Sequence, residues 1–253
     1  MNAKIDKLSE MEKVLNVKDA TNTGLISLFG RFGLGNLPRH LSLEKLDGIN
    51  SVTLILALCL LRINGNSIFA VYKSRFHGLL DTGKNCFYRM LLRPSMDWCR
   101  LLLGAICRFQ AIVCKEGADR SDTPRYYILD DTTLEKFGFS MERVSRVYVH
   151  GSGCCILGFK LLLLAVSDGV STFPVDFSLH REKGKNGNYG LSDKQQKKQY
   201  EAIRDTSSPM NTRLKECDRS KLDMAIEMLE RTWGHGIHAN YLLADSWFAL
   251  KDY

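Results

Sequence analysis

Two short apolar runs in this 253-residue chain each lead directly into aspartate, a residue type that binds divalent metal ions. Residues 126–129 (YYIL) precede the segment DDTT at 130–133, and residues 241–244 (YLLA) precede Asp245. Carboxylates at the ends of neighbouring strands can share divalent ions, and paired metal ions cut or join phosphodiesters. The two runs therefore predict a phosphoryl-transfer site that is built from strand-end aspartates.

The first run offers two adjacent candidates, Asp130 and Asp131, and each precedes a threonine by two positions. Successive residues of a strand point to opposite faces, so at most one of the two can face the site if the strand continues that far. Asp130 is favoured because it directly follows the apolar run. In the alternative interpretation, the pair merely ends a strand in a turn and has no role in chemistry.

The elements that must position these aspartates follow a strand-rich order in the second half of the chain. An apolar run at 156–166 follows a Gly-Ser-Gly turn, and a second run at 170–179 contains Pro174, which is typical of an edge or bulged strand. The Ser-Asp-Gly turn at 167–169 predicts that these two runs form an antiparallel hairpin. Helical patterns at 193–206 and 220–233 precede a last strand at 239–244. This order predicts an α+β fold with a mixed sheet flanked by helices.

The first half of the chain has a helical pattern, and we expect a division into residues 1–120 and 121–253. Ser42 and Ser51 are candidate helix caps, and the second of these helices ends at Ile63 before an Asn-Gly-Asn break. The clearest helix begins after Pro94, with Ser95 at its start, and Gly117 is its expected C-cap. The polar residues 115–125 are typical of a linker.

Composition favours a soluble protein with a polyanionic partner. The chain is 45% apolar and 25% charged, with a formal charge of +7, and its longest early apolar run, at 52–61, is too short to span a bilayer. We therefore expect a cytoplasmic location with no membrane partner. Eight cysteines without a Cys-x-x-Cys pair favour reduced, buried thiols. Residues 181–219 hold ten basic against six acidic residues, which makes them a candidate nucleic-acid contact.

In this order, the motifs resemble the DDE transposases of bacterial insertion sequences, whose catalytic domain has the RNase H-like fold. The resemblance is carried by DDTT (130–133), the hairpin GFKLLLLAVSDGVSTFPVDFSL (158–179), LADSWF (243–248) and the upstream helical segment GKNCFYRMLLRPSMDWCRLLL (83–103). It implies DNA strand cleavage and strand transfer at insertion-sequence ends with Mg²⁺, or with Mn²⁺ in its place. It also implies double-stranded DNA as the partner, a helical N-terminal domain that binds DNA, and a homo-oligomer assembled on DNA.

The same resemblance assigns the metal-binding and catalytic roles to Asp130 or Asp131 and to Asp245. A third acidic residue, a Glu on a later helix, has no counterpart here, because residues 246–253 contain no Glu. Glu182 and Glu201 precede Asp245 and do not fit the spacing. The resemblance therefore implies a C-terminally truncated chain with an incomplete RNase H-like domain, which we expect to be inactive in strand cleavage.

Two other functions compete with this interpretation. The first is a non-catalytic DNA-binding remnant, or a regulator of a full-length transposase, which the basic composition and helical first half would suit. The second is a phosphatase of the haloacid dehalogenase type. Its motif needs Asp-x-Asp after the strand, and Thr132 stands where Asp130 would need its partner.

Overall fold

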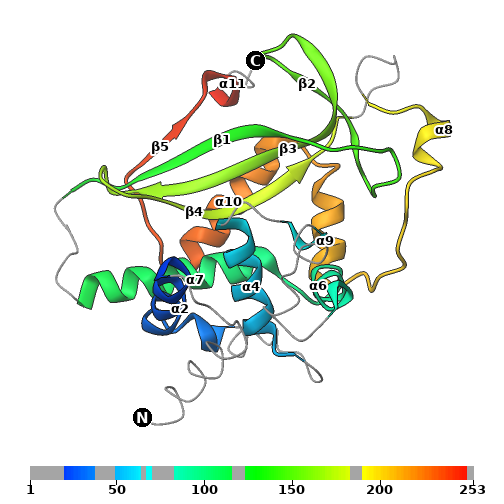
Figure 1. Ribbon diagram of the computed structural model, residues 1–253. Coiled ribbons are helices and arrows are strands. Elements are labelled where there is room, and N and C mark those ends of the chain that lie inside the picture. The colour runs from blue at the N-terminus through cyan, green and yellow to red at the C-terminus, as the bar shows by residue number, and fades with distance from the viewer. Residues whose placement is uncertain are drawn as a thin grey trace. The chain divides into compact units, whose positions relative to one another are not determined.

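The computed structural model describes residues 20–37, 49–63, 67–69, 83–115, 123–182 and 190–249. The chain forms two compact units, Met1–Glu116 and Gly117–Tyr253, and each is described by itself (Figure 1). The expected boundary lay at residue 120, within the predicted linker, and residues 116–122 of that linker lie outside the described residues. None of the described helices is long and apolar enough to cross a membrane.

The first unit is helical throughout its described part. Its elements are α2 (Ala20–Arg31), the short 3-10 helix η1 (Leu34–Asn36), α4 (Ser51–Ile63), α6 (Lys84–Leu91) and α7 (Trp98–Lys115). Its core joins α2, α4 and α6 through the buried residues Ile26, Leu54, Leu56, Ala57, Leu60, Cys86, Phe87 and Met90. Trp98, which begins α7, packs against this core.

Helix α4 matches the predicted segment, but its cap differs by one residue. Asn50 accepts a hydrogen bond from the Val52 amide at 2.9 Å, and Ser51 is already the first helical residue. The amide oxygen of Asn50 therefore satisfies an N-terminal donor that the sequence assigned to Ser51. The predicted helix start at Ser42 and the break at 64–66 lie outside the described residues.

Helix α7 begins three residues later than the sequence suggested. The Asp97 carboxylate accepts from the Arg100 amide at 2.9 Å, so the helix starts at Trp98 and not at Ser95. An aspartate one position before a helix satisfies an exposed amide of the first turn, which explains the shift. The expected C-cap at Gly117 lies outside the described residues.

The second unit is a five-stranded mixed sheet with helices, which confirms the predicted α+β class. Its strands are β1 (Tyr126–Glu135), β2 (Ser145–Val149), β3 (Cys154–Ser167), β4 (Thr172–His180) and β5 (Tyr241–Ala244). Its helices are α8 (Asp193–Gln196), α9 (Pro209–Glu216), α10 (Lys221–Gly234) and α11 (Ser246–Ala249). The long strand β3 pairs antiparallel with β1, β2 and β4, and β5 pairs parallel with β1.

The predicted hairpin is confirmed as β3 and β4, including its irregularity. Asp168 holds the turn by accepting from the Val170 and Ser171 amides at 2.9 and 2.7 Å. The register shifts between Leu164 and Ala165, where Ala165 pairs with Pro174. Proline has no N–H for the strand ladder, so a bulge at this point is the expected accommodation.

Three features of the second unit differ from the sequence prediction. Strand β2 was not predicted, nor was helix α9, and the helix expected over 193–206 reaches only Gln196. Beyond α8 the chain is held by the loop between β1 and β2. The Gln199 side chain donates to the Val144 carbonyl at 2.6 Å, and the Tyr200 amide donates to the Ser140 carbonyl at 2.8 Å. These tertiary contacts replace the helical hydrogen bonds that the local sequence favours.

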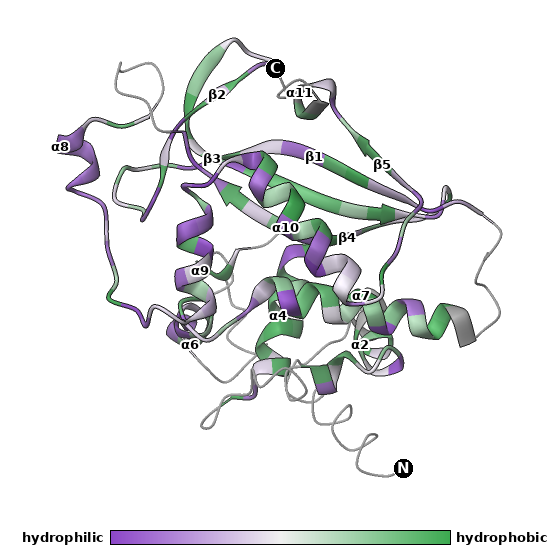
Figure 2. Ribbon diagram, turned by 180° about the vertical axis from the view of Figure 1, so that it is seen from behind, coloured by the Kyte–Doolittle hydropathy of each residue, from purple (hydrophilic) through white to green (hydrophobic). Residues whose placement is uncertain are grey.

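Helices α9 and α10 cover one face of the sheet and are joined to it by both apolar and ionic contacts. The side chains of Met224 and Met228 on α10 are buried, as are Leu162 and Leu164 on β3. In Figure 2 the colour of β3 is mainly that of hydrophobic residues, whereas α8 is hydrophilic. The covered face of the sheet is therefore the main core of this unit.

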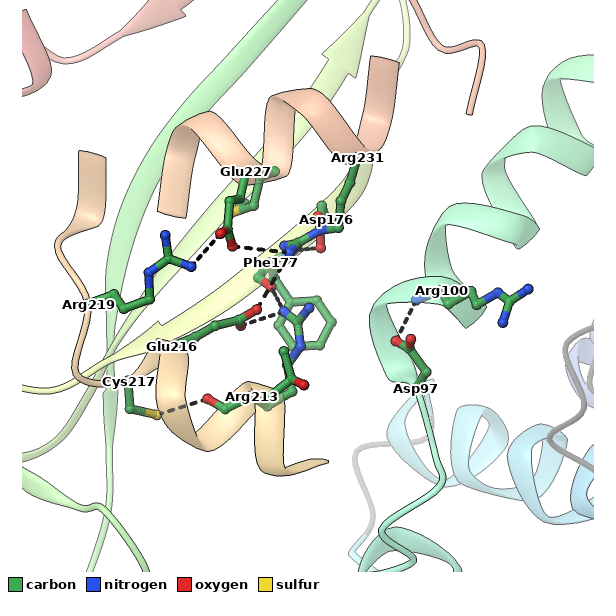
Figure 3. Close-up of polar contacts among 12 residues, drawn as sticks. Asp97, Arg100, Asp176, Phe177, Arg213, Glu216, Cys217, Arg219, Glu227 and Arg231 are labelled. Atoms are coloured by element: carbon green, nitrogen blue, oxygen red, sulfur yellow. Dashed lines mark hydrogen bonds and ion pairs between the residues drawn. The ribbon is translucent and has the colours of Figure 1, made fainter. Parts of the chain in front are cut away.

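A buried ionic network links β4 to these two helices (Figure 3). Arg231 of α10 lies 2.8 Å from Asp176 of β4 and 3.5 Å from Glu216 of α9. Glu216 also lies 2.8 Å from Arg213, which donates to the Phe177 carbonyl of β4. Asp176 and Glu216 are almost fully buried, so both carboxylates depend on these guanidinium groups. The network fixes the helices that lead the chain towards β5.

Candidate active site

The parallel pairing of β1 and β5 brings the two aspartate motifs to the same end of the strand pair. The register runs from Tyr126 opposite Tyr241 to Leu129 opposite Ala244. The next residue on each strand is an aspartate, Asp130 on β1 and Asp245 after β5. Each of these two residues directly follows the last residue pair of strands that lie about 4.8 Å apart.

The same register puts Asp130 on the face of the sheet that Tyr126 and Tyr241 share. The rings of Tyr126 and Tyr241 stack with their centroids 5.6 Å apart, so the paired residues share a face. Side chains alternate along a strand, so a residue four positions further on faces the same way. Both aspartates are exposed to solvent. Two exposed carboxylates thus follow the end of the pairing between β1 and β5.

Asp131 belongs to the opposite face. Its carboxylate forms an ion pair with the ammonium group of Lys221, the first residue of α10, and both side chains are partly buried. Strand β1 continues to Glu135 and pairs with β3 along its whole length. The alternative in which Asp130 and Asp131 end a strand in a turn is therefore wrong. The expectation that β1 ends at Leu129 is also wrong, because only the pairing of β1 with β5 ends at that residue.

Local hydrogen bonds orient both exposed carboxylates. Asp130 Oδ1 accepts from the Asp131 amide at 2.8 Å, and Asp245 Oδ1 accepts from the Ser246 hydroxyl at 3.1 Å. The Asp245 carbonyl also accepts from the Phe248 amide at 2.9 Å, which starts the short helix α11. Exposed carboxylate oxygens are the donors that a hard divalent cation prefers.

The site has two acidic residues and no third within the described part of the chain. Among the described residues, no group of three or more His, Cys, Asp or Glu side chains is placed to hold a metal ion. Two carboxylates can hold a divalent ion together with water, but they provide fewer protein ligands than a complete two-metal site uses.

Both ends of α10 are attached to β1, and these attachments were not foreseen from the sequence. Lys221 pairs with Asp131 at the start of the helix, and the Tyr127 hydroxyl donates to the Ile237 carbonyl just beyond its end. A cation in the first turn of a helix opposes the helix dipole. Lys221 stands there nonetheless, and nothing near it in the sequence indicates its partner Asp131, which lies 90 positions earlier.

His180 lies near this ion pair, at the end of β4. Burial lowers the pKa of His180, and the positive charge of Lys221 lowers it further. The backbone of Arg219 and the charges of Asp131 and Asp218 oppose this shift. The imidazole is therefore held in its neutral form on the covered face. It is not placed with the two exposed aspartates, because Asp131 and Lys221 lie on the other side of the sheet from them.

In the described part of the basic segment 181–219, Glu182 and Gly190 contact β2, and residues 199–200 contact the loop between β1 and β2, whereas α9 lies against β4. Residues 183–189 lie outside the described residues. The arginines of the segment pair with carboxylates: Arg181 with Asp218, Arg204 with Glu142, Arg213 with Glu216 and Arg219 with Glu227. Its lysines at 194, 197 and 198 are exposed. The arginines therefore contribute to the fold, and the lysines provide the accessible positive charge.

Comparisons of the chain with models of protein families, with curated proteins and with solved structures gave no match. The likeness to DDE transposases thus stays a prediction, which depends on the sequence motifs. The pairing of β1 with β5 adds the relative positions of the two aspartate motifs.

Proposed function

We propose that this chain is of the DDE transposase kind, acting in metal-dependent DNA strand cleavage and strand transfer at the ends of an insertion sequence. The observation that supports it best is the register of β5 on β1, in which the exposed residues Asp130 and Asp245 directly follow the last residue pair. We assign the metal-binding role to these two residues. Asp131, the less favoured of the two candidates in the sequence, is assigned to holding α10 through Lys221.

Mg²⁺ suits this pair, because it prefers carboxylate and water oxygens and keeps part of its hydration shell. When bound, the ion would offset the negative charge of the phosphodiester and activate the attacking oxygen. The residues of this chain contribute the two carboxylates and their orientation. Asp131 and Ser246 hold the carboxylate oxygens by hydrogen bonds.

We expect the 253-residue chain to bind a divalent ion without cleaving DNA. The segment after Asp245 contains no Glu. A third acidic ligand would complete the coordination of a second ion, and electrostatic stabilisation of the transition state is usually the largest catalytic term. Purified protein incubated with DNA that carries the element's ends should therefore give no nicks with Mg²⁺ or Mn²⁺. Metal-dependent nicking that disappears in Asp245→Ala would overturn this expectation.

Metal binding can be tested separately from cleavage by titrating the protein with Mn²⁺ and measuring free Mn²⁺ by electron paramagnetic resonance. We expect Asp130→Asn and Asp245→Asn each to weaken binding at least about tenfold, the scale seen when metal-site residues are altered. The matched control is Asp131→Asn, which changes the adjacent carboxylate on the other face and should retain Mn²⁺ binding. Loss of binding in the Asp131 variant alone would reverse the assignment. No Mn²⁺ binding by the unmodified protein would reject the proposed site.

A second candidate function is DNA binding without catalysis, and one specific feature of the second unit favours it. An arm formed by residues 190–205 is fixed to the loop between β1 and β2, where Arg204 pairs with Glu142 through two hydrogen bonds of 2.8 and 2.6 Å. This fixed arm carries exposed lysines at 194, 197 and 198 together with the exposed side chains of Tyr200 and Ile203. Lysines beside an exposed aromatic ring suit phosphates and bases, although Asp193, Glu201 and Asp205 reduce the net charge.

The arm can be tested by fluorescence anisotropy with a labelled DNA duplex over a series of salt concentrations. Each phosphate contact contributes about 0.9 to the slope of log affinity against log salt. Changing all three lysines of the arm to Gln should therefore lower the slope by up to about 3. The control variant changes the same three lysines to Arg, which retains the charge and should retain the slope. A Gln variant with the unmodified slope would exclude the arm as a DNA contact.

A further inference from the structure

Strand β5 is joined to β1 by a contact that precedes the strand itself. The Arg125 amide donates to the Asn240 side-chain oxygen at 2.9 Å, and the Asn240 amide donates to the Arg125 carbonyl at 2.8 Å. Asn240 thus binds one residue, Arg125, through both its side chain and its backbone. The first paired residues, Tyr126 and Tyr241, follow immediately on the two strands.

The side chains of β5 do little to specify which residue of β1 each one faces. Tyr241, Leu242 and Leu243 are between 48% and 58% exposed, so no face of the strand is deeply buried. All three are large and apolar, and their sequence does not alternate between apolar and polar. Register is specified strongly where one face is buried and weakly elsewhere. A slip of β5 by one residue would therefore cost little through burial, and the Tyr126–Tyr241 ring stack is a side-chain contact that it would break.

Such a slip would have a large effect on the exposed carboxylates. Side chains alternate in direction with a period of two, so a shift by one residue moves a whole set of side chains to the other face. Asp245 would then be displaced by one residue along β1 relative to Asp130. The hydrogen bond from Tyr127 to the Ile237 carbonyl also holds this part of the chain to β1, three residues before Asn240. The residues between Ile237 and Asn240 could change conformation and so permit a slip of β5.

We propose that Asn240 sets the register of β5 and is thereby a positioning residue for Asp245. The inference builds on the proposed metal site, because its functional consequence is the alignment of Asp245 with Asp130. The register itself is a separate and measurable property of the sheet. Asn240 touches neither a cation nor a substrate, and it acts only by fixing where the strand pairing begins.

Register can be read by disulfide formation between cysteines placed on the two strands, in a background with the exposed Cys154 changed to Ser. Ile128 and Leu243 are paired residues, and the spacing of about 4.8 Å between paired strands suits a disulfide. We expect Ile128→Cys to cross-link with Leu243→Cys and not with Leu242→Cys. In Asn240→Ala, cross-linking should spread to position 242.

The metal consequence is measured on the same variants by Mn²⁺ titration. Asn240→Ala should lower Mn²⁺ affinity at least about tenfold, as expected when the support of a metal ligand is removed. Asn240→Asp retains an oxygen that can accept from the Arg125 amide, so it should restore both the register and the affinity. The control Tyr127→Phe removes the other anchor and should retain both, even if its melting temperature falls as far as that of Asn240→Ala.

The two measurements separate this inference from the proposed function. A changed cross-linking pattern in Asn240→Ala, in a protein that binds no Mn²⁺, would support the register role and reject the metal site. An unchanged 128–243 cross-link in Asn240→Ala would overturn the register role, whatever the Mn²⁺ titration gives. Equal Mn²⁺ loss in Asn240→Asp and Asn240→Ala would also count against it, because the acceptor oxygen would then be irrelevant.

Discussion

Replacing Arg231 by Met should destabilise the second unit more than any change to its exposed ion pairs. Arg231 is the guanidinium shared by Asp176 and Glu216, whose side chains are only 1% and 2% exposed. Removing it leaves Asp176 as a buried carboxylate without its cation, whereas Glu216 keeps Arg213. The methylene stem is largely conserved in Met, so the charge is the main quantity that changes.

Breaking a buried ion pair from one side costs about 3–5 kcal/mol. Arg231 itself is partly exposed, so the lower end, about 3 kcal/mol, is the appropriate value. The control is Arg219→Met, because the Arg219–Glu227 pair is more than a third exposed on both sides. Exposed pairs contribute about 1 kcal/mol or less. The two variants should therefore differ by about 2 kcal/mol or more.

Urea denaturation followed by circular dichroism gives both free energies of unfolding. The difference in free energy of unfolding between Arg231→Met and Arg219→Met should also depend on pH. Burial raises the pKa of Glu216, whereas Arg213 and Arg231 lower it. Without Arg231, the Glu216 carboxyl binds a proton more tightly in the folded state than in the unfolded state. The folded state therefore gains stability as the pH falls. The penalty of Arg231→Met should thus be smaller at about pH 5 than at about pH 7. A penalty equal to that of Arg219→Met at both pH values would refute the reasoning.

Three further outcomes are expected. His180→Gln should reduce the loss of stability on acidification below about pH 6.5, because the lowered pKa of His180 means that the unfolded state takes up a proton first. The measurement is melting temperature against pH, and identical profiles for the variant and the unmodified protein would contradict this. Gly158→Ala should destabilise by at least about 2 kcal/mol in urea, because a Cβ there would lie 2.2 Å from a β1 carbonyl oxygen, whereas Gly151→Ala has open space and should cost little. In thiol labelling of the native protein, exposed Cys154 should react rapidly and Cys217 slowly, because burial raises the pKa of Cys217 to about 11; equal rates would show that Cys217 is accessible.

The parts of this fold that the sequence predicted are those with a strong local signal. Three local patterns each predict a structure from a few residues, and all three predictions are confirmed: the apolar run of β3, the turn at Asp168 and the proline in β4. Helix α10 is likewise found where the periodicity placed it. Strand β2 and the end of α8 were missed because they depend on contacts with distant residues, such as the bond from Gln199 to Val144.

For the candidate site, the sequence supplied the residues, and the structure supplied their directions. Within residues 126–133, only the position of Asp130 directly after the apolar run favours it over Asp131. The distinction comes from Lys221, which lies 90 positions further along the chain and pairs with only one of them. The position of Asp245 depends in the same way on strand pairing, which no local pattern in β5 specifies.

The parallel pair of β1 and β5 has a consequence for folding. The hairpin of β3 and β4 closes through a turn of a few residues, whereas 115 positions separate Arg125 from Asn240. Long-range pairings must overcome the entropy of closing a long loop before their contacts form, so β5 should dock after the rest of the sheet. Until then Asp130 and Asp245 belong to separate parts of the chain. A cation held by both would therefore favour only the completed fold and would slow the loss of its last strand.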